Sequence, residues 1–174
     1  PGASATQKLP QRDTLTWPWG GEKDGDDCKR TILQGQSRDG TVIRLADGAP
    51  GFEEPAQGDK YDRPQGKAVI WTGKAPAQRF RNAVRKLTID TGNNRGSTGL
   101  KFVANNQGCV RNVLIRGHGV AGLDLGYTDQ QGPCLTKNLR VEGFDHAMYT
   151  WGHVDSITMV NIDLSGYRET GILN

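Results

Sequence analysis

Four titratable residues in the second half of the chain have side chains suited to acid–base chemistry. Hydrolysis of a glycosidic bond needs two carboxyl groups, one on each side of the scissile bond. β-Elimination needs a base and a cation that neutralises a uronate, and Ca²⁺ held by carboxylates can supply that charge. The candidate catalytic residues are Asp124, Glu142, Asp145 and His146. Ca²⁺ is expected only if the chemistry is elimination, and no other cofactor or metal site is predicted.

Two aromatic and two basic residues lie near these candidates in the sequence and could hold a substrate. The rings of Tyr149 and Trp151 offer a flat apolar platform for a sugar ring, and Arg116 and Arg140 are the basic candidates. All four are therefore assigned to substrate binding as a hypothesis.

Each of these residue types also has a purely structural interpretation. Asp124 beside Lys101 would form a solvated pair of opposite charges on neighbouring strands. Asp145 and His146 fall at a turn, where an aspartate commonly bonds the backbone. Trp151 could equally cover the end of a coil. The sequence brings carboxylates, bases and aromatic rings near each other without a diagnostic catalytic set.

An internal repeat predicts the elements that must position these side chains. Two series of short apolar-x-apolar segments interleave, with steps of 26, 26 and 23 residues in one and 23, 25 and 24 in the other. The first series is Lys86–Ile89, Asn112–Ile115, Asn138–Val141 and Asn161–Leu164; the second is Gly99–Phe102, Gly122–Leu125, Ala147–Thr150 and Gly171–Asn174. Two series with matching periods indicate one coil of about two dozen residues, repeated.

The alternation inside each segment predicts strands with one buried face. Leu123 and Leu125 would point inward, and Asp124 outward. The repeat is too short for a propeller blade, lacks the helical half of an ankyrin or tetratricopeptide unit, and lacks the leucine-rich-repeat register. The predicted fold class is therefore all-β: a right-handed, single-stranded parallel β-helix.

Stacking of the coils predicts ladders of equivalent residues about 4.8 Å apart. Asn112, Asn138 and Asn161 would form an asparagine ladder at one turn. Lys101 would lie beside Asp124. A further outward ladder would alternate in charge, through Asp90, Arg116, Glu142 and Ser165.

The first part of the chain is less regular. Residues 1–29 are expected to be irregular, and residues 30–174 to form the coils, with a long loop near 47–67 that is rich in glycine, proline and charge. Early strands are predicted at Thr31–Leu33, Thr41–Leu45 and Ala68–Trp71. Cys109 and Cys134 are one coil apart, so a disulfide and stacked thiols both remain open.

The amino-acid composition limits the classes of partner that the sequence predicts. Hydrophobic residues make up 34% of the 174 residues and 24 are glycine, which suits an elongated fold with many sharp turns. The net charge of +3 comes from interspersed residues, so no nucleic-acid partner is predicted. No apolar run is long enough to span a bilayer, so no membrane partner is predicted either.

Four stretches of the chain resemble the pectate-lyase/polygalacturonase superfamily, in particular bacterial proteins related to family 28 glycosyl hydrolases. They are Thr31–Ile43, Phe80–Gly92 and Gly122–Tyr127 with Val141–Asp145, and the likeness covers residues 30 to 174. It implies a pectin-lyase-like solenoid and a secreted or cell-surface protein that acts on polysaccharide by hydrolysis or β-elimination. The substrate groove would run along the coils, with the loop near 47–67 as a wall.

The polygalacturonase motifs are mostly missing from this sequence. Only Gly117-His118-Gly119 is present, and it is more simply a turn, while the Asp26-Asp27 pair lies in the irregular N-terminal stretch. Whether the protein is an enzyme, and which polysaccharide it meets, stays open.

The final segment, Gly171–Asn174, is a strand with no capping element after it. An uncapped coil exposes strand edges and apolar surface. We therefore expect a fragment of a longer β-helix, or self-association through this coil. The alternative function is a non-catalytic solenoid that binds glycan or assembles into filaments or adhesins.

Overall fold

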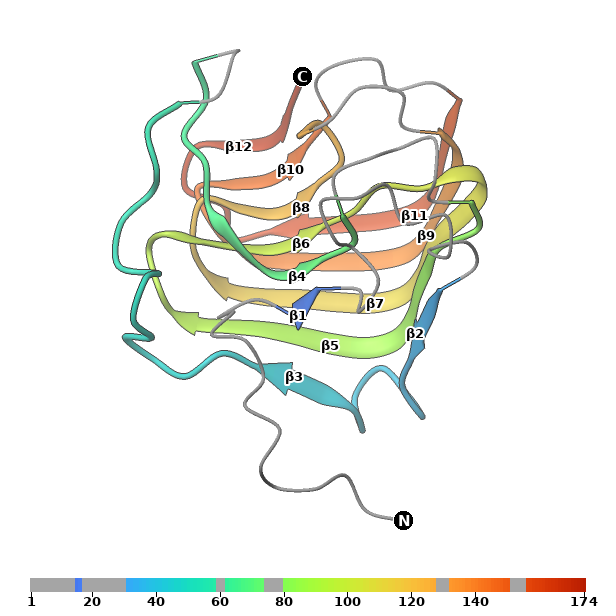
Figure 1. Ribbon diagram of the computed structural model, residues 1–174, viewed down its shortest axis with the longest axis horizontal. Coiled ribbons are helices and arrows are strands. Elements are labelled where there is room, and N and C mark those ends of the chain that lie inside the picture. The colour runs from blue at the N-terminus through green and yellow to red at the C-terminus, as the bar shows by residue number, and fades with distance from the viewer. Residues whose placement is uncertain (1–14, 17–30, 59–61, 74–79, 128–131, 151–155) are drawn as a thin grey trace.

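The computed structural model describes residues 15–16, 31–58, 62–73, 80–127, 132–150 and 156–174. These residues contain strands, turns and bends but no helix. All the strand pairs are parallel, and the chain stacks as a β-solenoid of about four turns, as the repeat predicted (Figure 1).

Two six-stranded sheets form the walls of the solenoid. Sheet A has the order β1-β4-β6-β8-β10-β12, and sheet B has the order β11-β9-β7-β5-β2, with β3 also paired to β5. Sheet A comprises β1 (Leu15–Thr16), β4 (Lys67–Trp71), β6 (Ser97–Lys101), β8 (Ala121–Asp124), β10 (His146–Tyr149) and β12 (Thr170–Leu173). Sheet B comprises β2 (Ile32–Gln34), β3 (Val42–Arg44), β5 (Ala83–Asn93), β7 (Asn105–His118), β9 (Gly132–Gly143) and β11 (Ile157–Ser165).

The predicted strands are confirmed, with two differences in extent. The strands of sheet B are longer than the four-residue segments that the repeat defined, because each continues past both ends of its apolar core. β1 lies inside the stretch that was expected to be irregular and pairs with β4.

The core lies between the two sheets and consists of in-register apolar columns. From sheet A, Ile70, Leu100, Leu123 and Met148 stack on one another, and all are fully buried. From sheet B the columns are Leu87–Val113–Leu139–Ile162 and Ile89–Ile115–Val141–Leu164. Full burial of one such side chain stabilises the fold by about 2 kcal/mol relative to leaving it in water.

A left-handed residue bends each long strand of sheet B. The φ angles of Lys86, Asn112, Asn138 and Asn161 lie between 51° and 55°. Asparagine adopts this region more readily than most residues. The predicted ladder is confirmed: Asn138 Nδ2 donates to Asn112 Oδ1 over 2.7 Å, and Asn161 Nδ2 donates to Asn138 Oδ1 over 2.9 Å. Each coil thus has one such bend, and the asparagine side chains at these bends join neighbouring coils by hydrogen bonds.

Residues 45–66, which we name the covering segment, connect β3 to β4, and described residues on both sides of positions 59–61 contact sheet A or the turns before its strands. Phe52 in this segment is fully buried, and its carbonyl accepts a hydrogen bond from Gly96 N over 2.8 Å. Further along, Tyr149 donates its hydroxyl hydrogen to the Pro64 carbonyl over 3.2 Å. In Figure 1 the segment climbs past the strands of sheet A before entering β4. The segment in which the loop was predicted thus contacts residues of several coils, whereas its role as the wall of a groove stays a prediction.

Cys109 and Cys134 are buried and not joined by a disulfide. The register explains this, because Cys109 pairs with Leu135, while Cys134 pairs with Gly108. An offset of one residue places the two side chains on opposite faces of the sheet. Cys28 lies outside the described residues.

Candidate functional site

The structure describes seven of the eight predicted site residues and divides them between the two sheets. Trp151 lies outside the described residues. Asp124, Asp145, His146 and Tyr149 belong to the strands and turns of sheet A, whereas Glu142, Arg116 and Arg140 lie on sheet B. Glu142 and Asp145 are separated although they are three residues apart, because the chain turns between the sheets at Gly143 and Phe144, both with positive φ.

The sheet B residues form charge ladders, as predicted. Arg116 pairs in register with both Asp90 and Glu142, and its Nε lies 3.0 Å from Asp90 Oδ2. Arg140 Nε lies 2.6 Å from Glu142 Oε1 and 3.4 Å from Asp163 Oδ2. The two Arg140 pairs are solvent-accessible and each contribute little to stability, on the order of 0–1 kcal/mol. Asp90, in the Arg116 pair, is buried. Glu142, a candidate acid or base, is engaged by Arg140.

Asp124 is the residue for which the solvated interpretation is wrong. Its Lys101 neighbour is confirmed, with Nζ 4.0 Å from Asp124 Oδ2, but the Asp124 side chain is only 1% exposed. Asp124 Oδ1 accepts the backbone N–H of Gly126 over 2.9 Å. The carboxylate points away from the core, yet the covering segment reaches over this part of sheet A and excludes water from it.

Arg63 of the covering segment is a buried charged side chain that lies against residues of sheet A. It is 6% exposed, its Nη2 donates to the Gly126 carbonyl over 3.1 Å, and its guanidinium carbon lies 4.7 Å from the centroid of the Tyr149 ring. Burial raises the pKa of Tyr149 well above its ordinary value. Tyr149 therefore stays protonated and serves as an anchor for the covering segment, with 1% of its surface exposed.

His146 is also sequestered. Its Nδ1 lies 2.7 Å from Thr170 Oγ1, its Nε2 lies 3.3 Å from Glu169 Oε2, and its ring centroid is 5.2 Å from that of Tyr149. Burial lowers the pKa of His146 below 6.5, although the nearby Glu169 and Asp145 carboxylates act in the opposite direction. Both ring nitrogens thus face β12 and its preceding turn.

Asp145 is held by an arginine of the next coil. Its Oδ1 accepts a hydrogen bond from Arg168 Nε over 2.6 Å, and its side chain is 26% exposed. Its backbone N–H donates to the Gly119 carbonyl over 2.9 Å. The residue links three coils, in agreement with its structural interpretation as a turn residue. In the motif Gly117-His118-Gly119, the first two residues end strand β7, with His118 exposed, and only Gly119 belongs to the bend before β8.

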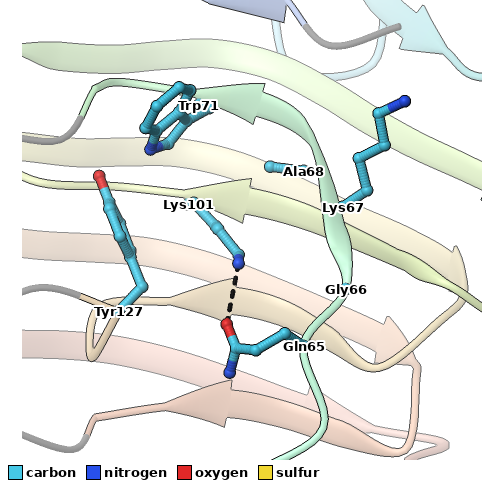
Figure 2. Close-up of a pocket in the computed structure, with 7 residues that line it drawn as sticks. All are labelled: Gln65, Gly66, Lys67, Ala68, Trp71, Lys101 and Tyr127. Atoms are coloured by element: carbon cyan, nitrogen blue, oxygen red, sulfur yellow. Dashed lines mark hydrogen bonds between the residues drawn. The ribbon is translucent and has the colours of Figure 1, made fainter. Parts of the chain in front are cut away.

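This face carries a pocket of about 290 Å³, which we name the sheet A pocket. Figure 2 shows Trp71 and Tyr127 on the same side of the sheet as Lys101, whose ammonium group points towards Gln65. Lys101 Nζ donates to Gln65 Oε1 over 2.9 Å and lies 5.9 Å from the Tyr127 ring centroid. The lining residues are Gln65, Gly66, Lys67, Ala68, Trp71, Lys101 and Tyr127.

Sequence reasoning missed the sheet A pocket as a site. The sequence predicts Trp71 in a strand and Lys101 in a ladder, but it does not predict that this in-register pair lies beside Tyr127. The available signal was the register itself, since Trp71, Lys101 and Asp124 occupy one outward column on successive strands.

Ca²⁺ finds no ready donor set in the described part of the chain. Among these residues, no three aspartate, glutamate, histidine or cysteine side chains are grouped to hold a metal ion. Asp124 and Asp145 are each bound to a cation or backbone group instead. The conditional expectation of Ca²⁺ therefore has no support in this geometry.

The sequence and structure were compared with known proteins. No protein-family model, no curated protein and no solved structure matches this chain. Within the described residues, no helix is long and apolar enough to cross a membrane.

Proposed function

We propose that this β-solenoid is a carbohydrate-active protein of the pectate-lyase type that binds an acidic polysaccharide through the sheet A pocket. The observation that carries the proposal is the combination of two aromatic rings with a lysine in one pocket on the face of the coils. Trp71 and Lys101 are in-register neighbours, and Tyr127 lies beside them. Aromatic rings pack against the apolar faces of sugars, while polar groups at the edge of such a pocket fix orientation.

The charges in the pocket favour an acidic sugar. Two lysines, Lys67 and Lys101, belong to the lining, and none of the described lining residues is a carboxylate. The Asp124 carboxylate lies 4.0 Å from Lys101 Nζ, but its side chain is only 1% exposed. The accessible charge is therefore positive, which suits the carboxylate of a uronate. A polymer of this kind is met outside the cell, so the protein is expected to be secreted or displayed on the cell surface.

Binding accounts for the geometry more simply than hydrolysis does. Glycoside hydrolysis needs two carboxyl groups that can both reach the scissile bond. Asp124 is covered, Asp145 is paired with Arg168, and Glu142 lies on the other sheet. The predicted catalytic set Asp124, Glu142, Asp145 and His146 therefore remains a hypothesis without an assembled centre.

β-Elimination is a second candidate, favoured by Lys101. Its side chain lines the sheet A pocket, and a lysine can either neutralise a uronate carboxylate as an ammonium or accept a proton as an amine. Elimination leaves an unsaturated sugar, so it is distinguished from binding by a product that absorbs ultraviolet light.

The test is calorimetric titration of the whole chain with oligomers of galacturonate, mannuronate and neutral glucan, together with the ultraviolet product assay. We expect acidic oligomers to bind, Trp71→Ala to weaken binding of every oligomer that binds, and Lys101→Met to remove the preference for acidic ones. Arg44→Ala, an exposed arginine on β3, is the control and should bind like the unmodified chain. Unchanged affinity in both pocket variants would overturn the assignment of the pocket.

A further inference from the structure

The outer face of sheet B carries a column of three basic side chains that the sheet A pocket does not involve. Arg85 pairs in register with Arg111, and Arg111 pairs in register with Lys137. The three residues come from β5, β7 and β9, so their backbones are separated by the rung spacing of about 4.8 Å. Arg111 is exposed, and Arg85 and Lys137 are half-buried.

This column differs from the neighbouring ladders because its charges do not alternate. On the other side of the bend, Arg116 lies between Asp90 and Glu142, and Arg140 contacts Glu142 and Asp163. Like charges placed directly opposite on adjacent strands destabilise a sheet. Opposite charges are therefore paired on one side of the bend, whereas Arg85, Arg111 and Lys137 repel one another on the other side.

No carboxylate of the described residues forms an ion pair with any of the three basic groups. Within the described part of the chain, one hydrogen bond involves their side chains: Arg85 Nε donates to the buried Cys109 Sγ over 3.2 Å. The positive charge of the column is extended by Lys86, which follows Arg85 at the bend and is exposed.

The residues around the column define its length and character. Gln34 pairs with Arg85 at one end, and Val160 pairs with Lys137 at the other, so the cations occupy three consecutive rungs. The parallel column beside it is Ala83, Cys109 and Leu135, which contains no aromatic ring. The strip is therefore straight, cationic and without a stacking platform.

We propose that Arg85, Arg111 and Lys137 form a second binding site, for an extended acidic polysaccharide that lies along the solenoid axis with successive anionic groups on successive rungs. A stretched chain with one anionic group per sugar can meet a straight column rung after rung. Single-stranded nucleic acid is disfavoured, because proteins that bind it combine basic grooves with aromatic platforms, and this strip has none. The site does not depend on the sheet A pocket.

The experiment is titration of the whole chain with three probes: a polyuronate oligomer, a sulfated polysaccharide oligomer and a single-stranded oligonucleotide. The test variant is Arg85→Gln/Arg111→Gln/Lys137→Gln. The matched control is Arg38→Gln/Arg44→Gln/Arg95→Gln, which removes the same number of charges from other parts of the described surface.

We expect the test variant to lose about tenfold or more in affinity for the polyuronate or the sulfated oligomer, and its slope of log affinity against log salt to fall by about 2, since three cation contacts are lost. The control should stay close to the unmodified chain. Which of the two acidic oligomers binds tighter identifies the anionic group.

A second readout uses the protein alone. Because the column is self-repulsive, the test variant should unfold at the same or higher temperature than the unmodified chain at low salt, which separates lost binding from lost folding. Equal losses in both triple variants, tighter binding of the oligonucleotide, or full affinity in the test variant would each overturn the proposal. Trp71→Ala should leave this binding intact, so failure of the sheet A pocket is distinguishable.

Discussion

At the scale of single residues, the asparagine ladder determines where each coil bends. Asn138 occupies the left-handed region and is hydrogen-bonded to Asn112 on one side and Asn161 on the other. A side chain amide can both donate and accept, so the same residue type can repeat along the stack. One residue type thus supplies the backbone conformation and the connection between coils.

We predict that Asn138→Ala lowers the free energy of unfolding by about 2–3 kcal/mol, because two ladder hydrogen bonds are lost and alanine is strained in the left-handed region. Asn138→Gly keeps the backbone conformation accessible and should cost less, about 1–2 kcal/mol. Urea unfolding monitored by circular dichroism measures both. An equal cost for the two variants would show that backbone strain plays no part.

His146 makes the stability depend on pH. Its folded pKa is lowered by burial, so between pH 6.5 and that lower value the unfolded chain binds more protons than the folded one. Stability should therefore fall as the pH drops below about 6.5. His146→Gln should remove this part of the decline. Melting temperatures measured from pH 8 to 5 check it, and identical slopes in both proteins would contradict it.

At the scale of elements, the turns between the sheets require close approach of the coils. A Cβ atom on Gly143, whose φ is 91°, would lie within van der Waals overlap of the Gly117 carbonyl oxygen of the coil before it. Glycine at this corner thus allows β9 to leave sheet B and the chain to enter β10. The corner also explains why Glu142 and Asp145 face different sides of the molecule.

We predict that Gly143→Ala destabilises the fold by about 3 kcal/mol or more, through backbone strain and a clash with backbone that cannot move aside. Gly48→Ala is the matched control. Gly48 also has positive φ, 63°, but a Cβ there meets nothing within 4 Å, so only the strain of about 1–2 kcal/mol applies. Chemical denaturation should separate the two by their midpoints; coincident midpoints would rule out the clash.

The covering segment is a second element that our predictions concern, because it packs on sheet A through contacts outside the repeat. Arg63 holds it over sheet A through Gly126 and the Tyr149 ring. We predict that Arg63→Ala costs about 2 kcal/mol, from a desolvated cation–π contact and a charged hydrogen bond, and makes residues 45–66 more sensitive to protease. Arg44→Ala, which disrupts the exposed pair with Asp47, should change neither. Unaltered proteolysis of the Arg63 variant would contradict this role.

At the scale of the whole molecule, the fold is one-dimensional, since each coil contacts only its neighbours and the covering segment spans several of them. The strands β7 and β9 have partners on both sides, whereas β11 and β12 have described partners on one side. Exposed apolar side chains belong to the outer rungs: Ile32, Val42, Met159, Val160, Tyr167 and Ile172. Self-association through the last coil remains a prediction.

Hydrogen exchange should follow this arrangement. We predict the slowest exchange in β5, β7 and β9, and faster exchange in β2, β3 and β12, because opening an outer rung disrupts fewer contacts than opening an inner one. Exchange measured by mass spectrometry on peptides checks the order. Uniform protection along the stack would indicate that the solenoid opens as a single unit.

The sequence by itself determined the coil, the register and the ladders. Leu87, Val113 and Leu139 recur at a fixed step, and a column of stacked rungs is the arrangement that buries them all. The order Asp90, Arg116, Glu142 follows from the same step, since parallel in-register strands place equivalent positions side by side. These features are local or periodic, so they can be derived from spacing alone.

Only the tertiary structure decided what covers each face. The covering segment meets the strand ends around the buried Asp124 through Arg63, which donates to the Gly126 carbonyl, and Gln65, which accepts from Lys101. Both precede Asp124 by about sixty residues and follow no repeat. The sheet A pocket likewise joins Trp71, Lys101 and Tyr127 with Gln65 of that segment. The physical reason is that periodicity fixes which residues stack within the solenoid, whereas the path of a non-repeating segment is set by side-chain contacts over long sequence separations.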